Sequence, residues 1–118
     1  MLTVTMPRRD IRLIRFQIYD AQTGQLSAVD FDEIYMSVKK TIYDRDVIFQ
    51  KRLSNGGIEK LGPGDYQIKI DSEDTSGLNF NLTYPFDIEL VYGDEIRQTE
   101  CGELTITPEV TCAWNEVT

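Results

Sequence analysis

Hydrophobic and polar side chains alternate along the second half of the chain, and this period of two constrains the fold more than any other feature. The alternation runs through residues 66–70, 86–92 and 104–106, and an acidic turn at residues 71–78 interrupts it. A strand presents successive side chains to opposite faces, so this period predicts strands that bury one face. The pattern therefore predicts a sheet, but it contributes no reactive chemistry.

The first half of the chain adds further strands and turns. Alternation predicts strands at residues 12–19, 33–42 and 47–53, and a short strand at residues 2–6 that Pro7 ends. Turn-forming residues mark the connections at Asp20–Gly24, Tyr43–Asp46, Asn55–Gly57, Gly62–Asp65 and Gly93–Asp94. Short strands at this spacing predict an all-β, antiparallel β-sandwich, with a closed barrel as the alternative.

Two segments depart from simple alternation. Ser72 can cap a helix and Gly77 can end one, so one short helical turn is expected near residues 72–77, with Leu78 closing an end of the core. Leu13 lies on the opposite parity from the other apolar residues of its strand, which suggests a bulge or a strand with both faces partly covered.

One face of each predicted strand supplies the expected core. Its members are Ile14, Phe16, Ile34, Met36, Val38, Tyr66, Ile68, Phe86, Ile88, Leu90, Leu104 and Ile106. A chain of 118 residues with 41% hydrophobic residues has the size of one domain with one core. We expect that domain at residues 1–111 and a C-terminal tail at residues 112–118.

The chain shows neither a run of about 18 apolar residues, as a membrane helix needs, nor the apolar segment of a secretion signal. We therefore expect no membrane partner and a protein made in the cytosol. The net charge of −8 is uneven, with +2 over residues 1–70 and −10 over residues 71–118. The acidic half argues against nucleic acid as a partner, because phosphates would be repelled.

Composition also disfavours catalysis and cofactors. The chain has no histidine, which removes the commonest general base and metal ligand, so we expect no enzyme. Cys101 and Cys112 cannot hold a structural zinc ion by themselves, because such a site needs four ligands. We expect two reduced thiols, as is usual in the cytosol, and an intramolecular disulfide is the alternative. Acidic clusters lie where turns favour acids, and Asp71–Asp74 is the best calcium candidate among them. We expect no cofactor.

Two of the predicted hairpins carry opposite charge. A basic hairpin spans residues 34–53 and an acidic hairpin spans residues 86–105. The candidate interaction surface consists of Lys39, Lys40, Lys51, Arg52, Asp87, Glu89, Glu100 and Glu103. Opposite charges on two ribbons suit head-to-tail contact between copies, which can close a ring. The alternative is that the two hairpins are neighbours within one monomer.

The order of elements resembles that of small domains in tailed-phage and prophage structural proteins, notably the N-terminal domain of phage baseplate upper proteins. The resemblance covers roughly residues 10–111. Its elements are IYMSVKK, the Asp44–Asp46 turn, VIFQKRL, NGGI, GDYQIKI, EDTSGL, FDIELVY and GELTITPEVT.

This resemblance implies an immunoglobulin-like sandwich that serves as an assembly or attachment module of a virion. Its partners would be other virion proteins, and it would occur in the virion or, before assembly, in the host cytoplasm. Because the sequence ends shortly after the matched region, a joining role is expected rather than host binding. The alternative is a carbohydrate-binding or cell-surface adhesion module, for which Tyr19, Tyr35, Tyr43 and Trp114 could stack on sugars.

Overall fold

The computed structural model describes residues 2–108, apart from the side chains of residues 97–100. These residues form eight strands, joined by turns and loops, and no helix. The strands are β1 (Leu2–Pro7), β2 (Arg12–Gln17), β3 (Glu33–Val38), β4 (Phe49–Arg52), β5 (Ile58–Gly62), β6 (Asp65–Ile70), β7 (Thr83–Tyr92) and β8 (Glu95–Thr107). Within these residues no helix is long and apolar enough to cross a membrane. The tail at residues 112–118, with Cys112 and Trp114, lies outside the described part.

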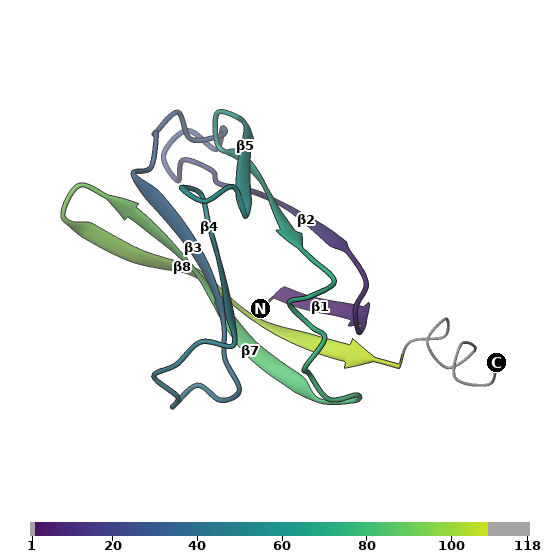
Figure 1. The fold of residues 1–118 in the computed structure, drawn as a ribbon. Coiled ribbons are helices and arrows are strands. Elements are labelled where there is room, and N and C mark those ends of the chain that lie inside the picture. The colour runs from purple at the N-terminus through teal and green to yellow at the C-terminus, as the bar shows by residue number, and fades with distance from the viewer. Residues whose placement is uncertain (1, 109–118) are drawn as a thin grey trace.

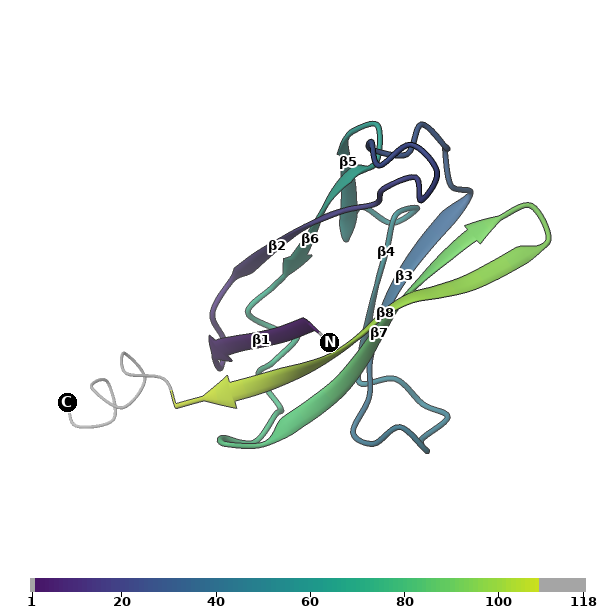
Figure 2. The ribbon, with the colours of Figure 1, turned by 180° about the vertical axis from the view of Figure 1, so that it is seen from behind.

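The strands form two facing sheets, as Figures 1 and 2 show. The larger sheet has the order β1-β8-β7-β3-β4 and the smaller one has the order β2-β6-β5. Every pairing is antiparallel except that of β1 with β8. The orders β8-β7-β3 and β2-β6-β5 correspond to strands GFC and BED of an immunoglobulin domain, with β4 in the place of C′. The predicted immunoglobulin-like sandwich is therefore confirmed, and the barrel alternative is wrong.

The core lies between the two sheets. All of the predicted core residues are buried except Phe16, which is half-buried and packs against the core. The ring of Phe16 stacks on the ring of Tyr66, its partner across the β2–β6 pair, with 5.5 Å between ring centroids. The core also contains Val4, Met6, Ile58, Ile70, Leu78 and Tyr84. Edge and end residues thus complete a core that alternation located in the central strands.

A buried tyrosine fixes the entry to β7. The hydroxyl of Tyr84 accepts a hydrogen bond from the backbone N–H of Asn79, 3.0 Å away. A tyrosine at the start of strand F that bonds to backbone a few residues upstream is the tyrosine corner of immunoglobulin-like domains. Tyr84 is 5% exposed, so the bond is shielded from water.

Residues 72–77 form successive turns, so the predicted helical turn is wrong. The backbone N–H of Asp74 donates to the carbonyl of Asp71, and that of Leu78 donates to the carbonyl of Thr75, which are bonds three residues apart. The carboxylate of Asp74 also accepts from the N–H of Asp71 at 2.7 Å. A segment this short does not recover the cost of nucleating a helix, and its polar side chains bond to nearby backbone instead.

The turn at residues 72–77 is anchored from two directions. Thr75 is fully buried, and its Oγ1 accepts a hydrogen bond from the N–H of Arg9 at 2.8 Å. Leu78 is 6% exposed, which confirms that it closes an end of the core.

The connection between β3 and β4 is longer than predicted. Residues 39–48, named the β3–β4 loop below, project from the sandwich in Figure 1. The turn lies at residues 41–44, where the N–H of Asp44 bonds to the carbonyl of Thr41, and not at Tyr43–Asp46. Ile42, which has the same parity as Ile34, Met36 and Val38 in the predicted strand at residues 33–42, is 69% exposed. Pairing with β7 ends at Val38 and Phe86; the N–H of Lys39 still donates to the carbonyl of Pro85, but Pro85 has no N–H with which to continue the ladder.

The outer face of β2 carries an exposed apolar side chain. Leu13 is 55% exposed and β2 pairs with β6 in unbroken register, so neither a bulge nor a second covered face explains it.

Candidate functional site

The predicted basic and acidic hairpins lie side by side in the larger sheet. β3 pairs with β7, which places Asp87 opposite Ser37 and Glu89 opposite Tyr35. The guanidinium of Arg52, on β4, lies 5.1 Å from the centre of the Tyr35 ring. The two hairpins are therefore neighbours within one monomer, and contact between copies through their charges stays a prediction.

Lys51 belongs to the interior and not to the candidate interaction surface. It lies opposite Met36 on the inner face of β4 and is 8% exposed. Its Nζ lies 2.6 Å from the Asp74 carboxylate and 3.3 Å from that of Asp71. The lysine thus ties the edge strand β4 to the turn that follows β6.

The calcium candidate at Asp71–Asp74 has its two aspartates in ion pairs with Lys51. The carboxylates of Asp71 and Asp74 face a lysine, and among the side chains that the structure describes there is no group of three or more Cys, Asp and Glu placed to hold a metal ion.

The other predicted site residues are spread around the larger sheet. Lys39 and Lys40 lie at the start of the β3–β4 loop, where the N–H of Lys39 donates to the carbonyl of Pro85 at 2.9 Å. Glu103 lies on β8 opposite Pro85 and is half-buried. The backbone of Glu100 pairs with Ile88, and its side chain lies outside the described part.

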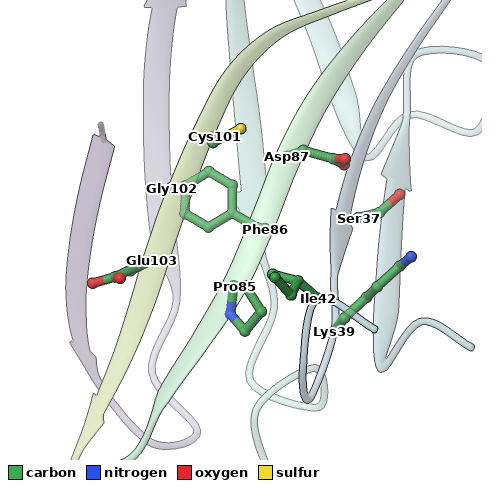
Figure 3. Close-up of a pocket in the computed structure, with 9 residues that line it drawn as sticks. All are labelled: Ser37, Lys39, Ile42, Pro85, Phe86, Asp87, Cys101, Gly102 and Glu103. Atoms are coloured by element: carbon green, nitrogen blue, oxygen red, sulfur yellow. The ribbon is translucent and has the colours of Figure 1, made fainter. Parts of the chain in front are cut away.

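A shallow groove of about 380 Å³ joins several of these residues on the outer face of the larger sheet. Figure 3 shows Lys39, Asp87 and Glu103 around it, with the Phe86 ring beside Gly102. Its charges are mixed, with one lysine near two carboxylates. Cys101 also lines it.

Sequence reasoning missed a larger groove of about 810 Å³, named the end groove. It lies between the segment at residues 18–31 and the β7–β8 hairpin. Its lining residues are Ile18, Tyr19, Asp20, Ala21, Ser27, Val29, Phe31, Leu90, Tyr92, Gly93, Asp94 and Glu95. The only charges among them are acidic. Tyr19 and Tyr92 are 58% and 57% exposed, so aromatic surface faces solvent at its rim.

Hydrogen bonds hold the walls of the end groove in place. The carboxylate of Asp32 accepts from the N–H of Gly93 at 2.6 Å, and the N–H of Asp32 donates to the carbonyl of Val91 at 2.8 Å. On the other wall, the N–H of Ser27 donates to the carbonyl of Ile18 at 2.8 Å. The groove is therefore a formed feature of the fold. Its only sequence signal was the pair of tyrosines next to turn residues.

The tyrosines suggested for sugar stacking lie apart. Tyr19 lines the end groove, Tyr35 is half-buried beside Arg52, and Tyr43 is 88% exposed in the β3–β4 loop. They do not form one platform.

Neither a protein-family model nor a curated protein matches this chain.

Proposed function

We propose that the chain is a structural, non-catalytic component of a phage or prophage virion, associated with the baseplate or tail and acting through protein–protein contacts. The order of its sequence elements supports the virion assignment. The observation that supports a role in protein–protein contact is the end groove, because the tyrosines at its rim, Tyr19 and Tyr92, are largely exposed to solvent. Exposed apolar surface rimmed by polar residues marks interaction sites.

The β3–β4 loop adds a second surface of this kind. Ile42 and Tyr43 are 69% and 88% exposed, although burying such side chains would be favourable by roughly 1.5–3 kcal/mol each. A stable sandwich that presents apolar side chains on a projecting loop fits a module that joins other virion proteins. The chain would then occur in the virion, or in the host cytoplasm before assembly.

Particle composition tests this function. Particles purified by density gradient from a lysate of the strain that carries the gene should contain the chain in a fixed ratio to the other tail proteins. Deleting the gene should give particles with incomplete tails or baseplates and reduced infectivity. Complete, fully infectious particles from the deletion strain would refute the proposal.

A carbohydrate-binding or cell-surface adhesion module is the second candidate. The two exposed tyrosines at the rim of the end groove favour it, because sugar rings stack on such side chains. Glycan-array binding that Tyr19→Ala and Tyr92→Ala both abolish would support this alternative. The absence of binding to any glycan would remove it.

A further inference from the structure

The two ends of the larger sheet carry surfaces of opposite character. The end groove is apolar and its charged lining residues are Asp20, Asp94 and Glu95. The β3–β4 loop presents Tyr43 at its tip and carries three basic side chains against two acidic ones. An acidic, aromatic-rimmed groove and a basic, aromatic-tipped loop are complementary in both charge and polarity.

Topology keeps these two surfaces apart within one molecule. The backbone of Asp32, just before β3, is bonded to Val91 at the groove end of the sheet, whereas the loop leaves β3 after Val38 at the other end. The intervening strand of six residues spans roughly 20 Å. Figure 1 shows the loop and the tip of the β7–β8 hairpin projecting from different ends of the sheet. The loop therefore cannot fill the groove of its own chain.

We propose that the β3–β4 loop of one copy inserts Tyr43 into the end groove of a second copy. This inference rests on the proposed function and names one partner within it, the chain itself. The contact joins two different patches, so each copy retains an unused loop and an unused groove. Such a heterologous contact propagates into a ring or an open filament.

The size and stiffness of the groove fit this occupant. A volume of about 810 Å³ falls within the range of roughly 300–1,000 Å³ typical of sites that bury ligands, which is ample for a loop tip. Walls held by backbone hydrogen bonds lose little freedom on binding. Arg45 lies two residues beyond Tyr43, between Asp44 and Asp46, and is the basic side chain of the loop nearest to Tyr43 in the sequence.

Mixing two variants tests the contact. The loop variant Tyr43→Ser/Arg45→Glu keeps an intact groove, and the groove variant Tyr92→Ser/Asp94→Lys keeps an intact loop. By sedimentation velocity at low salt, the unaltered chain should form assemblies that grow with concentration, and each variant alone should associate at least about tenfold more weakly. A mixture of the two should form a dimer and stop there, because only one intact loop and one intact groove can meet.

Matched controls separate this contact from general effects of charge and exposure. Glu59→Lys makes the same charge change as Asp94→Lys on the exposed face of β5, and Leu82→Ser removes an apolar side chain that is 46% exposed. Both should assemble like the unaltered chain, and in dilute solution, where copies do not associate, every variant should melt within a few degrees of it. Should the loop variant unfold, Asp94→Lys alone gives the same test from the groove side.

Several results would overturn the inference. These are a single-copy mass at all concentrations, a mixture that stays monomeric, or a groove that takes up a glycan in place of the loop. A monomeric chain that is still present in purified particles would refute the self-contact and leave the virion role standing. Assembly in solution with no chain in particles would do the reverse.

Discussion

At the scale of single residues, the buried lysine of β4 departs most from a simple division between inside and outside. Lys51 contacts two carboxylates, at 2.6 Å and 3.3 Å, with 11% of its side chain exposed. Removing one partner of a shielded ion pair leaves the opposite charge uncompensated. Lys51→Met should therefore lower the free energy of unfolding by about 1–3 kcal/mol in urea titrations.

Lys69 provides the control for this prediction. It lies 3.7 Å from Asp71 with 54% of its side chain exposed, and exposed pairs contribute little. Lys69→Met should stay within about 0.5 kcal/mol of the unaltered chain. Equal effects at the two lysines would show that burial of the Lys51 pair has no energetic consequence.

The ring of Phe86 packs against the backbone of Gly102 and leaves no room for a side chain there. A Cβ at this position would lie 2.3 Å from Cζ of Phe86 and 2.6 Å from the carbonyl oxygen of Leu2, so backbone would have to move. Gly102→Ala should destabilise the chain by about 1–3 kcal/mol in thermal or urea unfolding. Gly77→Ala, where a Cβ meets nothing within 4 Å, should change stability by less than about 0.5 kcal/mol. An unaltered melting curve for Gly102→Ala would contradict the packing described for Phe86.

Glu33 links stability to pH. Burial raises the pKa of its carboxyl, but hydrogen bonds from Ser54 and Ile34 outweigh burial, so the pKa lies below its usual value. Folding therefore favours the ionised form, and its stabilisation is present above the unfolded pKa and lost as pH falls through the folded one. Glu33→Gln should cost less than about 1 kcal/mol at neutral pH, and this difference should shrink as the pH falls through the folded-state pKa of Glu33. A gap that is constant from pH 7 to pH 3 would exclude the charge of Glu33 as its source.

At the scale of elements, sequence reasoning succeeded where one face of a strand is buried. Alternation located the central strands because a shift by one residue would expose every core side chain. It failed at strand ends. The early end of β3 depends on pairing with β7, and the inward direction of Lys51 depends on carboxylates twenty or more residues away. Local pattern contains neither kind of information.

Local sequence pattern also could not predict the end groove. The end groove brings residues 18–31 against residues 90–95, and no short window of sequence contains both walls. The charged hairpins were visible as composition, but only their pairing showed that they are neighbours.

The entry to β7 offers a test of one element boundary. The bond from the Asn79 N–H to the Tyr84 hydroxyl joins the segment after β6 to the start of β7. Tyr84→Phe removes this acceptor and keeps the buried ring, so the free energy of unfolding should fall by about 1 kcal/mol. Amide exchange of Asn79 should accelerate more than that of the β7 core. Unaltered exchange at Asn79 would show that the bond does not secure this corner.

At the scale of the whole molecule, acidic side chains gather on one face of the larger sheet. The net charge is −8, and folding gathers Asp87, Glu89 and Glu103 on the outer face of two adjacent strands. Asp87 and Glu103 are diagonal neighbours across the pair, at a spacing of roughly 7–8 Å between backbones. Self-repulsion of this kind opposes the compact state, whereas exposed ion pairs such as Arg15–Asp65 contribute little.

Screening should therefore stabilise the fold. A salt concentration near 0.1 M shortens the range of electrostatic interaction to about 10 Å, which weakens repulsion across the acidic face. Raising sodium chloride from about 0.02 M to about 0.3 M should raise the melting temperature by a few degrees. The scans should use dilute protein, since association between copies would also shift the transition. Glu103→Gln should raise the melting temperature at low salt and reduce its dependence on salt. A melting temperature that falls as salt is added would mean that attractive pairs, and not like-charge repulsion, dominate the electrostatics of this domain.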